Sequence, residues 1–354
     1  MAQILSVGTS VPPYELKQEE VRQFAHKMFA ERFSDIDRLL HIFENTAIER
    51  RRFSKERAWF EQDHSFSERN REYIEIACQL GEEAILHCLN QVQLTPSEVD
   101  HLIFVSTTGL ATPSIDAHLI NRLEMNPYVK RTPVWGLGCA GGAAGLARAY
   151  EIARADPESK VLLLTLELCG LTFRRKDLSK SNLVATSLFA DGAAAVLVTG
   201  EKVTLPNKAK GPRILDTMSM IWPDSLDVMG WEMKDDGFKV VFSKDIPTIV
   251  RREVRAVVDS FLSRSGLSLD DIGCYITHPG GKKVLAAYEE ALSLNKGALD
   301  QAHSILRSFG NMSSATVLFV LDQELKLAHE VGTYGLLMAL GPGFSTEMVL
   351  IQWE

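Results

Sequence analysis

A short stretch of small residues surrounds one cysteine. Residues 136–146 read GLGCAGGAAGL, so five glycines and three alanines flank Cys139. The stretch joins an apolar run, PVWGLG, to AGGAAGLARAYEIA, and we expect a strand to turn into a helix there. The positive end of a helix favours a thiolate over a thiol, and glycines let a substrate and other backbone approach the sulfur closely. These features indicate a nucleophile, although a lone cysteine in such a stretch is more often a small core residue.

Two more polar residues complete a reactive set. His278 follows the apolar run GCYIT and precedes Pro-Gly-Gly, and Asn311 opens a helix in GNMSSA. A Cys–His pair can exist as thiolate and imidazolium, ready to attack a thioester. An asparagine side-chain N–H and a histidine N–H together make an oxyanion hole with two donors. Alone, the histidine would only cap a turn and the asparagine a helix. Their combination with the cysteine favours catalysis.

The two halves of the chain repeat one pattern. In each half a helix end, a turn, a strand and a loop are predicted, followed by a helix and then by a turn of small residues. Ser106 precedes Cys139 by 139 − 106 = 33 residues, and His278 precedes Asn311 by 311 − 278 = 33 residues. Two copies related by a pseudo-twofold axis would bring their helix starts to one centre. We therefore expect Cys139, His278 and Asn311 to meet there.

Apolar runs alternate with amphipathic runs along the whole chain. Buried strands are predicted at residues 3–9, 101–107, 133–138, 161–168, 193–200, 213–220, 238–243, 273–278, 335–341 and 344–353. The helices predicted between them include residues 66–90, 140–155, 246–263 and 282–293. Buried strands separated by helices predict an α/β fold in which helices cover sheets. The polar segment 199–213 is the predicted joint, which gives an N-terminal half at 1–205 and a C-terminal half at 206–354.

The composition limits the partners of the chain. Its 354 residues are 45% apolar, enough for a large core. The net charge of −8 makes the chain a poor nucleic-acid binder. The N-terminus lacks the pattern of a signal peptide, and no apolar run reaches the roughly 18 residues of a membrane span. The five cysteines have no CxxC spacing, which indicates reduced thiols in a cytoplasm rather than disulfides or a zinc site.

Five motifs together carry a resemblance to a known family. They are GLGCAGG (136–142), THPGG (277–281), GNMSSA (310–315), SLFADGAAA (187–195) and ALGPGF (339–344). With them, the sequence closely resembles the thiolase-fold condensing enzymes over essentially its whole length. Within that group it resembles the type III polyketide synthases, the chalcone-synthase family. The resemblance implies a layered αβαβα fold of two duplicated halves, and a homodimer with one nucleophile per subunit.

The resemblance also implies roles for individual residues. It makes Cys139 the nucleophile, His278 and Asn311 the pair that assists decarboxylation, and Phe189 a gatekeeper between a coenzyme A tunnel and the reaction cavity. The other substrate-binding residues that it implies are Thr172, Val240, Trp231, Thr112, Ser313, Gly280, Gly281 and Arg38. The substrates would be an acyl-CoA and malonyl-CoA, with no bound cofactor and no metal. Further candidate cations for the CoA phosphates are Arg50, Arg51, Arg52, Arg174, Arg175, Lys176, Lys282 and Lys283.

The sequence departs from the plant members of the family near the expected pocket. Ala140 follows the nucleophile where a bulky residue is usual, Val240 aligns with a second gatekeeper phenylalanine, and Trp231 falls near a pocket glycine. The pattern, including VMGWEM and HPGGKK, looks most like bacterial members that act on fatty acyl-CoA and release alkylpyrones. We therefore expect a fatty starter and tri- or tetraketide alkylpyrones, although Trp231 could refill the space that Val240 leaves.

Other functions remain open from the sequence. A fatty-acid-initiating ketoacyl synthase would use acyl carrier protein, but its histidine is typically followed by Gln-Ala-Asn rather than Pro-Gly-Gly. An HMG-CoA-synthase-like enzyme needs a glutamate base, and none is evident by motif. A non-catalytic binding protein of the thiolase fold would have no reason to keep all three polar residues. A papain-like hydrolase is disfavoured by the fold pattern and by Asn311 at a helix start.

Overall fold

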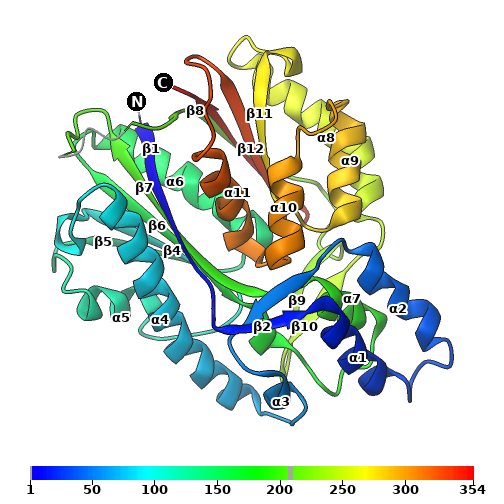
Figure 1. The fold of residues 1–354 in the computed structure, drawn as a ribbon. Helices are drawn as coiled ribbons and strands as arrows, with labels where there is room; N and C mark the ends of the chain where they lie inside the picture. Colours follow the sequence, from blue (N-terminus) through cyan, green and yellow to red (C-terminus); the bar gives the residue numbers. More distant parts are fainter. Residues whose placement is uncertain (1, 206–209) are drawn as a thin grey trace.

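The computed structural model describes residues 2–205 and 210–354 (Figure 1). The domain boundary predicted between residues 205 and 206 touches the segment 206–209, which lies outside the described residues, so it stays a prediction. The two ends of the chain lie together, and the Gln3 side chain donates a hydrogen bond to the Glu354 carboxylate at 3.1 Å. Within the described residues, no helix is long and apolar enough to cross a membrane.

One large mixed sheet organises the fold. Its strands follow the order β11-β12-β13-β8-β1-β7-β6-β4-β5. Their bounds are β1 (Ala2–Ser10), β4 (His101–Val105), β5 (Lys130–Val134), β6 (Lys160–Leu168), β7 (Asp191–Gly200), β8 (Arg213–Ile221), β11 (Ile272–Thr277), β12 (Tyr334–Gly341) and β13 (Ser345–Gln352). Two antiparallel strand pairs lie apart from it: β2 (Tyr14–Lys17) with β3 (Arg50–Phe53), and β9 (Met229–Lys234) with β10 (Gly237–Phe242). The central strands β6 and β7 are almost entirely buried, which explains their mostly apolar sequences.

The two halves of this sheet have the same topology. In the first half, β1 pairs antiparallel with β7, β7 antiparallel with β6, and β6 parallel with β4. In the second half, β8 pairs antiparallel with β13, β13 antiparallel with β12, and β12 parallel with β11. The half-sheets join where Ala2 and Gln3 pair with Ile214 and Arg213. The duplication predicted from the sequence is therefore confirmed.

Helices form the layers around and between the half-sheets. Their bounds are α1 (Gln18–Phe29), α2 (Ile36–Asn45), α3 (Arg57–Phe60), α4 (Phe66–Gln91), α5 (Ile115–Arg122), α6 (Gly141–Ala155), α7 (Lys180–Leu188), α8 (Ile246–Ser263), α9 (Lys282–Leu292), α10 (Asp300–Phe309) and α11 (Thr316–Glu324). Helices α6 and α11 contact strands of both half-sheets and so form the middle layer (Figure 1). Helix α4 packs against β1, β6 and β7, while α8 and α9 share a hydrophobic core with β11, β12 and β13. This is the predicted αβαβα arrangement.

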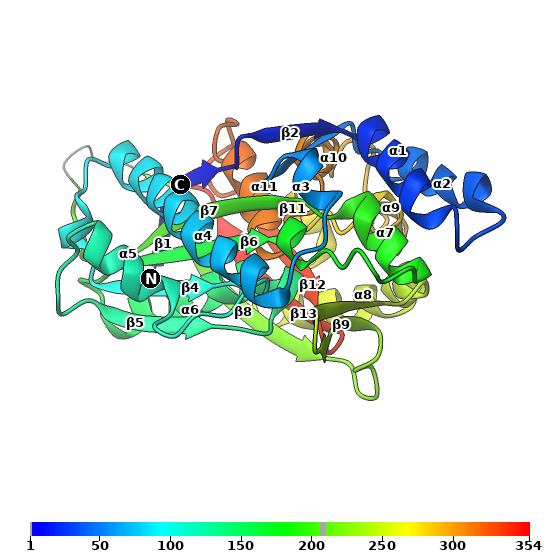
Figure 2. The same ribbon diagram turned by 90° about the horizontal axis from the view of Figure 1, so that it is seen from below.

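A smaller group of elements lies at one end of the molecule. Helices α1, α2 and α7 contact one another there, next to the β9–β10 pair (Figure 2). The strand predicted at residues 238–243 is β10, which belongs to this pair rather than to the main sheet. The strand predicted at 133–138 is displaced, since β5 ends at Val134. The chain turns there because Gly136 and Gly138 adopt φ values of 97° and 48°, which a strand cannot accommodate.

Candidate active site

The structure brings Cys139, His278 and Asn311 together. All three line one small, mostly apolar cavity, together with Met229, Phe242, Ile246, Gly280, Val284, Tyr288 and Leu340. The Cys139 Sγ lies 3.9 Å from Asn311 Oδ1 and 3.6 Å from Ser313 Oγ. All three side chains are at least 94% buried, since their exposed fractions are 6%, 3% and 1%. The meeting point that the 33-residue spacing predicts is thus present in the fold.

Small residues let the two repeats approach each other at the cysteine. Cys139 lies in a short 3-10 turn, Gly138–Ala140, immediately before α6, and the Gly138 N–H donates to Thr107 Oγ1 at 3.1 Å. The start of α11 packs directly on the start of α6. A Cβ on Gly142 would lie 2.4 Å from the backbone oxygen of Ser314, so no larger residue fits there without movement. The glycines beside the nucleophile therefore serve the contact between the two middle-layer helices.

His278 lies directly after the end of β11, and its ring is not held by a hydrogen bond to the described part of the chain. Its backbone N–H donates to the Met338 carbonyl on β12 at 2.9 Å, which continues the parallel strand pairing to the site. Both ring nitrogens are buried and neither has a hydrogen-bond partner within the described chain. An unpartnered buried imidazole is costly unless a ligand pairs with it. The ring is therefore available to a substrate in the cavity.

Asn311 is held by its backbone and by its own side-chain oxygen. Its N–H donates to the Leu188 carbonyl at 2.9 Å, and its carbonyl accepts from the Ala190 N–H at 2.8 Å. Its Oδ1 accepts the Ser313 N–H at 2.8 Å, and its Nδ2 donates to the Gly280 carbonyl at 3.4 Å. Because Nδ2 carries two hydrogens, one remains for a ligand oxygen.

Burial sets the protonation of the pair. It raises the pKa of the Cys139 thiol to about 11, against the lowering effect of its contact with Ser313. Burial also lowers the pKa of His278 to about 3. At neutral pH both groups are therefore uncharged in the free site. The sequence reasoning allowed a thiolate–imidazolium pair, and desolvation opposes both charges of such a pair in the free site.

Glu167, a buried glutamate that the sequence analysis did not include among the site residues, hydrogen-bonds to segments next to the site. The carboxylate of Glu167 accepts hydrogen bonds from the Thr107 N–H at 2.9 Å, the Thr108 hydroxyl at 2.9 Å and the Ser314 hydroxyl at 2.6 Å. These donors come from the loop after β4 and from the turn before α11, so Glu167 ties the two repeats together. Burial raises its pKa to about 7. A charged residue inside the apolar run VLLLTLEL was the signal in the sequence.

We expect Glu167→Ala to lower the free energy of unfolding by about 3 kcal/mol or more, because buried donors lose their acceptor. Glu167→Gln should lower the free energy of unfolding far less. Its amide oxygen can still accept from the threonine donors, and the Ser314 hydroxyl can turn to accept from its amide N–H. The raised pKa means that the folded state binds the proton more tightly than the unfolded state. The Glu167 contribution therefore falls by up to about 3 kcal/mol as pH rises from 4.5 to 7.

Urea unfolding of wild type and Glu167→Gln at several pH values checks this. The difference between the two proteins isolates Glu167 from His278, whose lowered pKa gives the opposite slope. Glu61→Ala, at an exposed glutamate, is the control and should change stability by less than about 0.5 kcal/mol. Equal pH slopes in wild type and Glu167→Gln would contradict the assignment.

A larger apolar cavity adjoins the reactive one. Its volume, including the solvent space at its mouth, is about 740 Å³, and Phe189, Thr172, Val240 and Trp231 are among the residues that line it. The β9–β10 register places Trp231 directly opposite Val240, and the Trp231 and Phe189 ring centres are 6.4 Å apart. Phe189 and Asn311 also form an isolated β-bridge. Of the other predicted residues, Gly280 lines the reactive cavity, Ser313 contacts the sulfur, and Gly281 caps the start of α9.

Two predicted binding residues lie away from these cavities. Arg38 is on the exposed side of α2, where it pairs with Asp35 at 2.5 Å. Thr112 is exposed in the loop before α5 and lines none of the cavities described above. The remaining candidate cations differ in their surroundings.

Arg51 is a core residue rather than a phosphate ligand, which corrects the expectation for that position. Its guanidinium donates to the carbonyls of Thr186 and Phe189 at 2.8 Å, and to Gln18 Oε1 at 2.8 Å. Arg174 is held by Asp177 and Asp236. By contrast, Lys282 and Lys283 are exposed at the start of α9 and form no ion pair with another described residue.

The two duplicated half-sheets, the helices packed between them and the buried Cys–His–Asn cavity define a thiolase-like condensing enzyme. Residues 1–202 match the N-terminal domain of the chalcone and stilbene synthases, and residues 213–353 match the C-terminal domain. The chain belongs to this family. It is a type III polyketide synthase, an acyltransferase that condenses malonyl-CoA.

Individual relatives cover the chain almost completely. A protein of Bacillus subtilis (strain 168), provisionally named chalcone synthase, is 49% identical over 100% of this chain and 99% of its own length. The 1,3,6,8-tetrahydroxynaphthalene synthase of Streptomyces peucetius subsp. caesius is 38% identical over 99% of this chain and 93% of its own. The crystal structure of the synthase of that name from Streptomyces coelicolor A3(2) matches with a TM-score of 0.94 and 27% identity, over 99% of each chain.

Proposed function

We propose that this enzyme loads a fatty acyl group from acyl-CoA on Cys139 and extends it with malonyl-CoA to tri- and tetraketide alkylpyrones. The observation that carries the proposal is the shared cavity of Cys139, His278 and Asn311. A thiol, an unpartnered imidazole and an amide donor in one water-poor cavity suit thioester exchange and decarboxylative condensation.

In the loading step, Cys139 attacks the acyl-CoA carbonyl. A bond forms between the carbonyl carbon and Sγ, and the bond from that carbon to the CoA sulfur breaks. His278 takes the thiol proton and passes it to the departing CoA thiolate. The free imidazole is uncharged because burial lowers its pKa to about 3, so it can accept this proton only transiently, when the substrate fills the cavity.

In the extension step, malonyl-CoA loses CO2 and the electron pair of the broken C–C bond forms an enolate. The enolate oxygen is stabilised by the N–H of neutral His278 and by the free N–H of Asn311. Each such donor contributes about 3 kcal/mol to lowering the barrier. The enolate carbon then attacks the acyl–Cys139 carbonyl, and the cysteine sulfur leaves. The acyl chain is now longer by two carbons, and it closes to a pyrone after further rounds.

The apolar lining of the larger cavity supports a fatty starter. Beyond Phe189 and Trp231, the larger cavity runs along apolar side chains of the group of elements around α1 and α3: Leu16, Val21, Phe24, Phe53 and Phe60. Its polar exceptions include Glu20, Arg51 and Arg57 near the same elements. An alkyl chain gains roughly 0.8 kcal/mol for each methylene buried there.

Lys282 and Lys283 are candidates for binding the coenzyme A phosphates, because their exposed side chains follow directly after Gly280 and Gly281 at the start of α9. We propose that the CoA thioesters are substrates only and that the reaction uses no bound cofactor. We also propose a cytoplasmic location, where the five cysteines would stay reduced.

A second candidate product class is aromatic. Relatives are named 1,3,6,8-tetrahydroxynaphthalene synthase and 3,5-dihydroxyphenylacetyl-CoA synthase. Trp231 favours this alternative because its indole stands opposite Val240 and narrows the space beside the nucleophile.

One incubation series decides between the two. The enzyme is given malonyl-CoA alone or with saturated acyl-CoA starters of graded length, and the products are identified by mass spectrometry. Alkylpyrones whose mass follows the starter support the proposal. An aromatic product made equally well without a starter would replace it with the second candidate, and no product from any combination would overturn both.

We expect Val240→Phe to shorten the accepted chain or reduce the number of extensions. The phenyl ring would fill space that Val240 leaves beside Trp231 and Phe189. Across starters of two to sixteen carbons, the free energy gained by burying the alkyl chain spans roughly 10 kcal/mol, before the cost of ordering the chain is subtracted. The ratio of long-chain to short-chain products, read by mass spectrometry, should fall at least about tenfold, or 1.4 kcal/mol. Val331→Phe makes the same change on the surface and should leave the ratio unchanged. An unaltered ratio in Val240→Phe would show that Val240 does not border the chain.

We also propose a homodimer that uses the segment around residues 111–123. Leu110 and Trp135 beside it expose 41% and 48% of their surfaces, and the Trp135 indole N–H donates to the Gly109 carbonyl, so the two lie close together. Light scattering should give a mass near twice 39.4 kDa. Leu110→Glu should shift the mass toward one chain, whereas Leu327→Glu, equally exposed elsewhere, should not. A wild-type protein that is a fully active monomer would contradict the proposal.

A further inference from the structure

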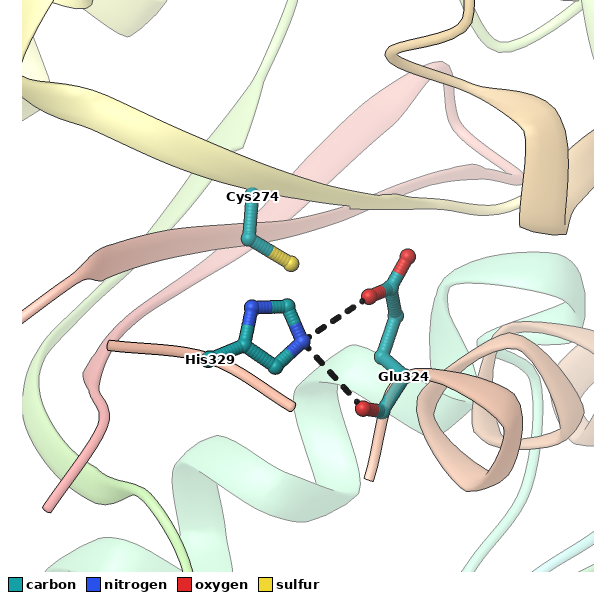
Figure 3. Close-up of side chains that lie close together, drawn as sticks. All are labelled: Cys274, Glu324 and His329. Carbon is teal, nitrogen blue, oxygen red and sulfur yellow. Dashed lines mark hydrogen bonds and ion pairs between the residues drawn. The ribbon is translucent and has the colours of Figure 1, made fainter. Parts of the chain in front are cut away.

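A second group of reactive side chains lies outside the active site. Cys274 on β11, Glu324 at the end of α11 and His329 in the loop before β12 point toward one another (Figure 3). One ligand atom from each lies within 4.8 Å of the others. The cysteine and the glutamate are buried, with exposed fractions of 5% and 7%. The catalytic steps described above use none of the three.

The histidine ring is fixed before any ligand arrives. Its Nε2 lies 3.2 Å from the Glu324 carboxylate and 3.2 Å from the Glu324 backbone oxygen. On its face it stacks against Trp353, with ring centres 4.0 Å apart and planes 9° apart. The Gly332 N–H and the Trp353 N–H bind backbone oxygens across the same junction, at 2.8 and 3.0 Å. The loop that carries His329 is therefore held against the C-terminal strand.

The donors form a set that suits zinc. A thiolate sulfur, an imidazole nitrogen and a carboxylate oxygen are the three ligand types that bind this ion, usually in a tetrahedron. With metal–ligand bonds of 2.0–2.3 Å, a tetrahedral site holds its ligand atoms about 3.3–3.8 Å apart. The widest pair here has to close by only about 1 Å, a movement within reach of a cysteine rotamer.

From this geometry we propose that Cys274, Glu324 and His329 bind a zinc ion. On binding, the Cys274 thiol loses its proton to solvent and a sulfur–zinc bond forms. The imidazole supplies a neutral nitrogen and the glutamate a carboxylate oxygen, and a water molecule completes the tetrahedron. Two anionic ligands and one divalent cation leave no net charge in the buried site, which keeps the cost of burying charge low.

The position of the site indicates a structural role. Strand β11 carries Cys274 and leads directly to His278, while helix α11 ends at Glu324 and begins just after Asn311. A metal at this place would join the far ends of the two elements that position the oxyanion donors. No metal motif is visible in the sequence, because the three ligands are spread over 56 positions, from 274 to 329, without a paired spacing.

An ordinary ion pair is the competing explanation, and the chain contains a matched example. His303 and Glu289 also lie 3.2 Å apart, but they pair on the surface between α9 and α10 without a cysteine. His303→Gln is therefore the control for His329→Gln. The protein is used full-length and without an affinity tag, because a histidine tag would itself bind zinc.

Metal analysis of the purified protein is the first test. We expect one zinc per chain in wild type and in His303→Gln, and loss of the metal in Cys274→Ser and His329→Gln. Loss of a supporting residue outside the ligand set already weakens metal binding 10- to 100-fold, so loss of a direct ligand should weaken zinc binding more than about 100-fold. Cobalt in place of zinc should give the near-ultraviolet absorption of a cobalt–thiolate bond, absent from Cys274→Ser.

Wild-type protein alone provides the second test, in case a variant fails to fold. Removing the metal with a chelator should lower the melting temperature, and adding zinc should restore it, because a ligand that binds only the folded state stabilises it. The proposal is overturned if wild type takes up no more zinc than Cys274→Ser and its melting temperature is unchanged by chelator and by zinc. The product experiment above is independent of this result, so either proposal can fail without the other.

Discussion

Cys139→Ala should abolish polyketide formation, with a loss of at least about 10⁴-fold in turnover, the scale seen when a covalent nucleophile is removed. The alanine leaves the fold intact because it is smaller than the thiol and fills the same small, apolar cavity. The acyl-enzyme should also disappear, so that mass spectrometry of wild type incubated with acyl-CoA shows the added acyl mass and the variant shows none. Cys78→Ala, at a buried cysteine of α4, should retain both turnover and the acyl mass. Acylation that survives in Cys139→Ala would place the nucleophile elsewhere.

The protonation of Cys139 gives this prediction a pH dependence. Because burial raises the thiol pKa to about 11, the thiolate fraction of the free enzyme grows about tenfold per pH unit below that value. Alkylation of Cys139 by iodoacetamide should therefore keep accelerating from pH 7 to pH 10. A rate that levels off below pH 8 would instead indicate a resting thiolate stabilised by His278.

Much of the fold follows from local sequence patterns. Helices α4, α6, α8 and α9 lie within one or two residues of their predicted bounds. The amphipathic period and the capping residues of such helices are local properties; α4, for example, is capped by Ser65, whose side chain accepts the Glu68 N–H at 3.2 Å. The buried strands β6 and β7 are recognisable in the sequence as mostly apolar runs. The equal spacing in the two repeats then predicts the meeting of the three polar residues.

What the sequence could not provide depends on contacts between distant segments. Arg51 is a core arginine because it donates hydrogen bonds to Gln18 and to the end of α7. The run Arg-Arg-Arg alone does not show which of its arginines is buried in this way and which could bind phosphate. The protonation of Cys139 likewise depends on how completely the second repeat covers it. Glu167 and its donors come from both repeats, so only the folded chain shows that this charge is satisfied.

The second large effect is expected at Asn311. Asn311→Ala should leave acyl loading on Cys139 largely intact but slow malonyl-CoA decarboxylation about 10²- to 10³-fold, the loss typical of one oxyanion donor. His278→Ala should impair both steps, because the ring accepts the thiol proton during loading and donates to the enolate during decarboxylation. Acyl mass on the protein reports loading, and release of labelled CO2 from malonyl-CoA reports decarboxylation.

Asn311→Asp separates the donor role of Asn311 from its role in holding the turn. The alanine variant also leaves the Ser313 N–H without its acceptor, so a slow enzyme could merely have lost the turn at the cysteine. Aspartate keeps an oxygen for that N–H and removes both amide hydrogens. If the donor matters, Asn311→Asp stays as slow in decarboxylation as Asn311→Ala while its melting temperature returns toward that of wild type. Recovery of decarboxylation in Asn311→Asp would show that the residue acts by positioning Ser313 and Cys139, and a block in loading with decarboxylation intact would reverse the assignment of the two steps.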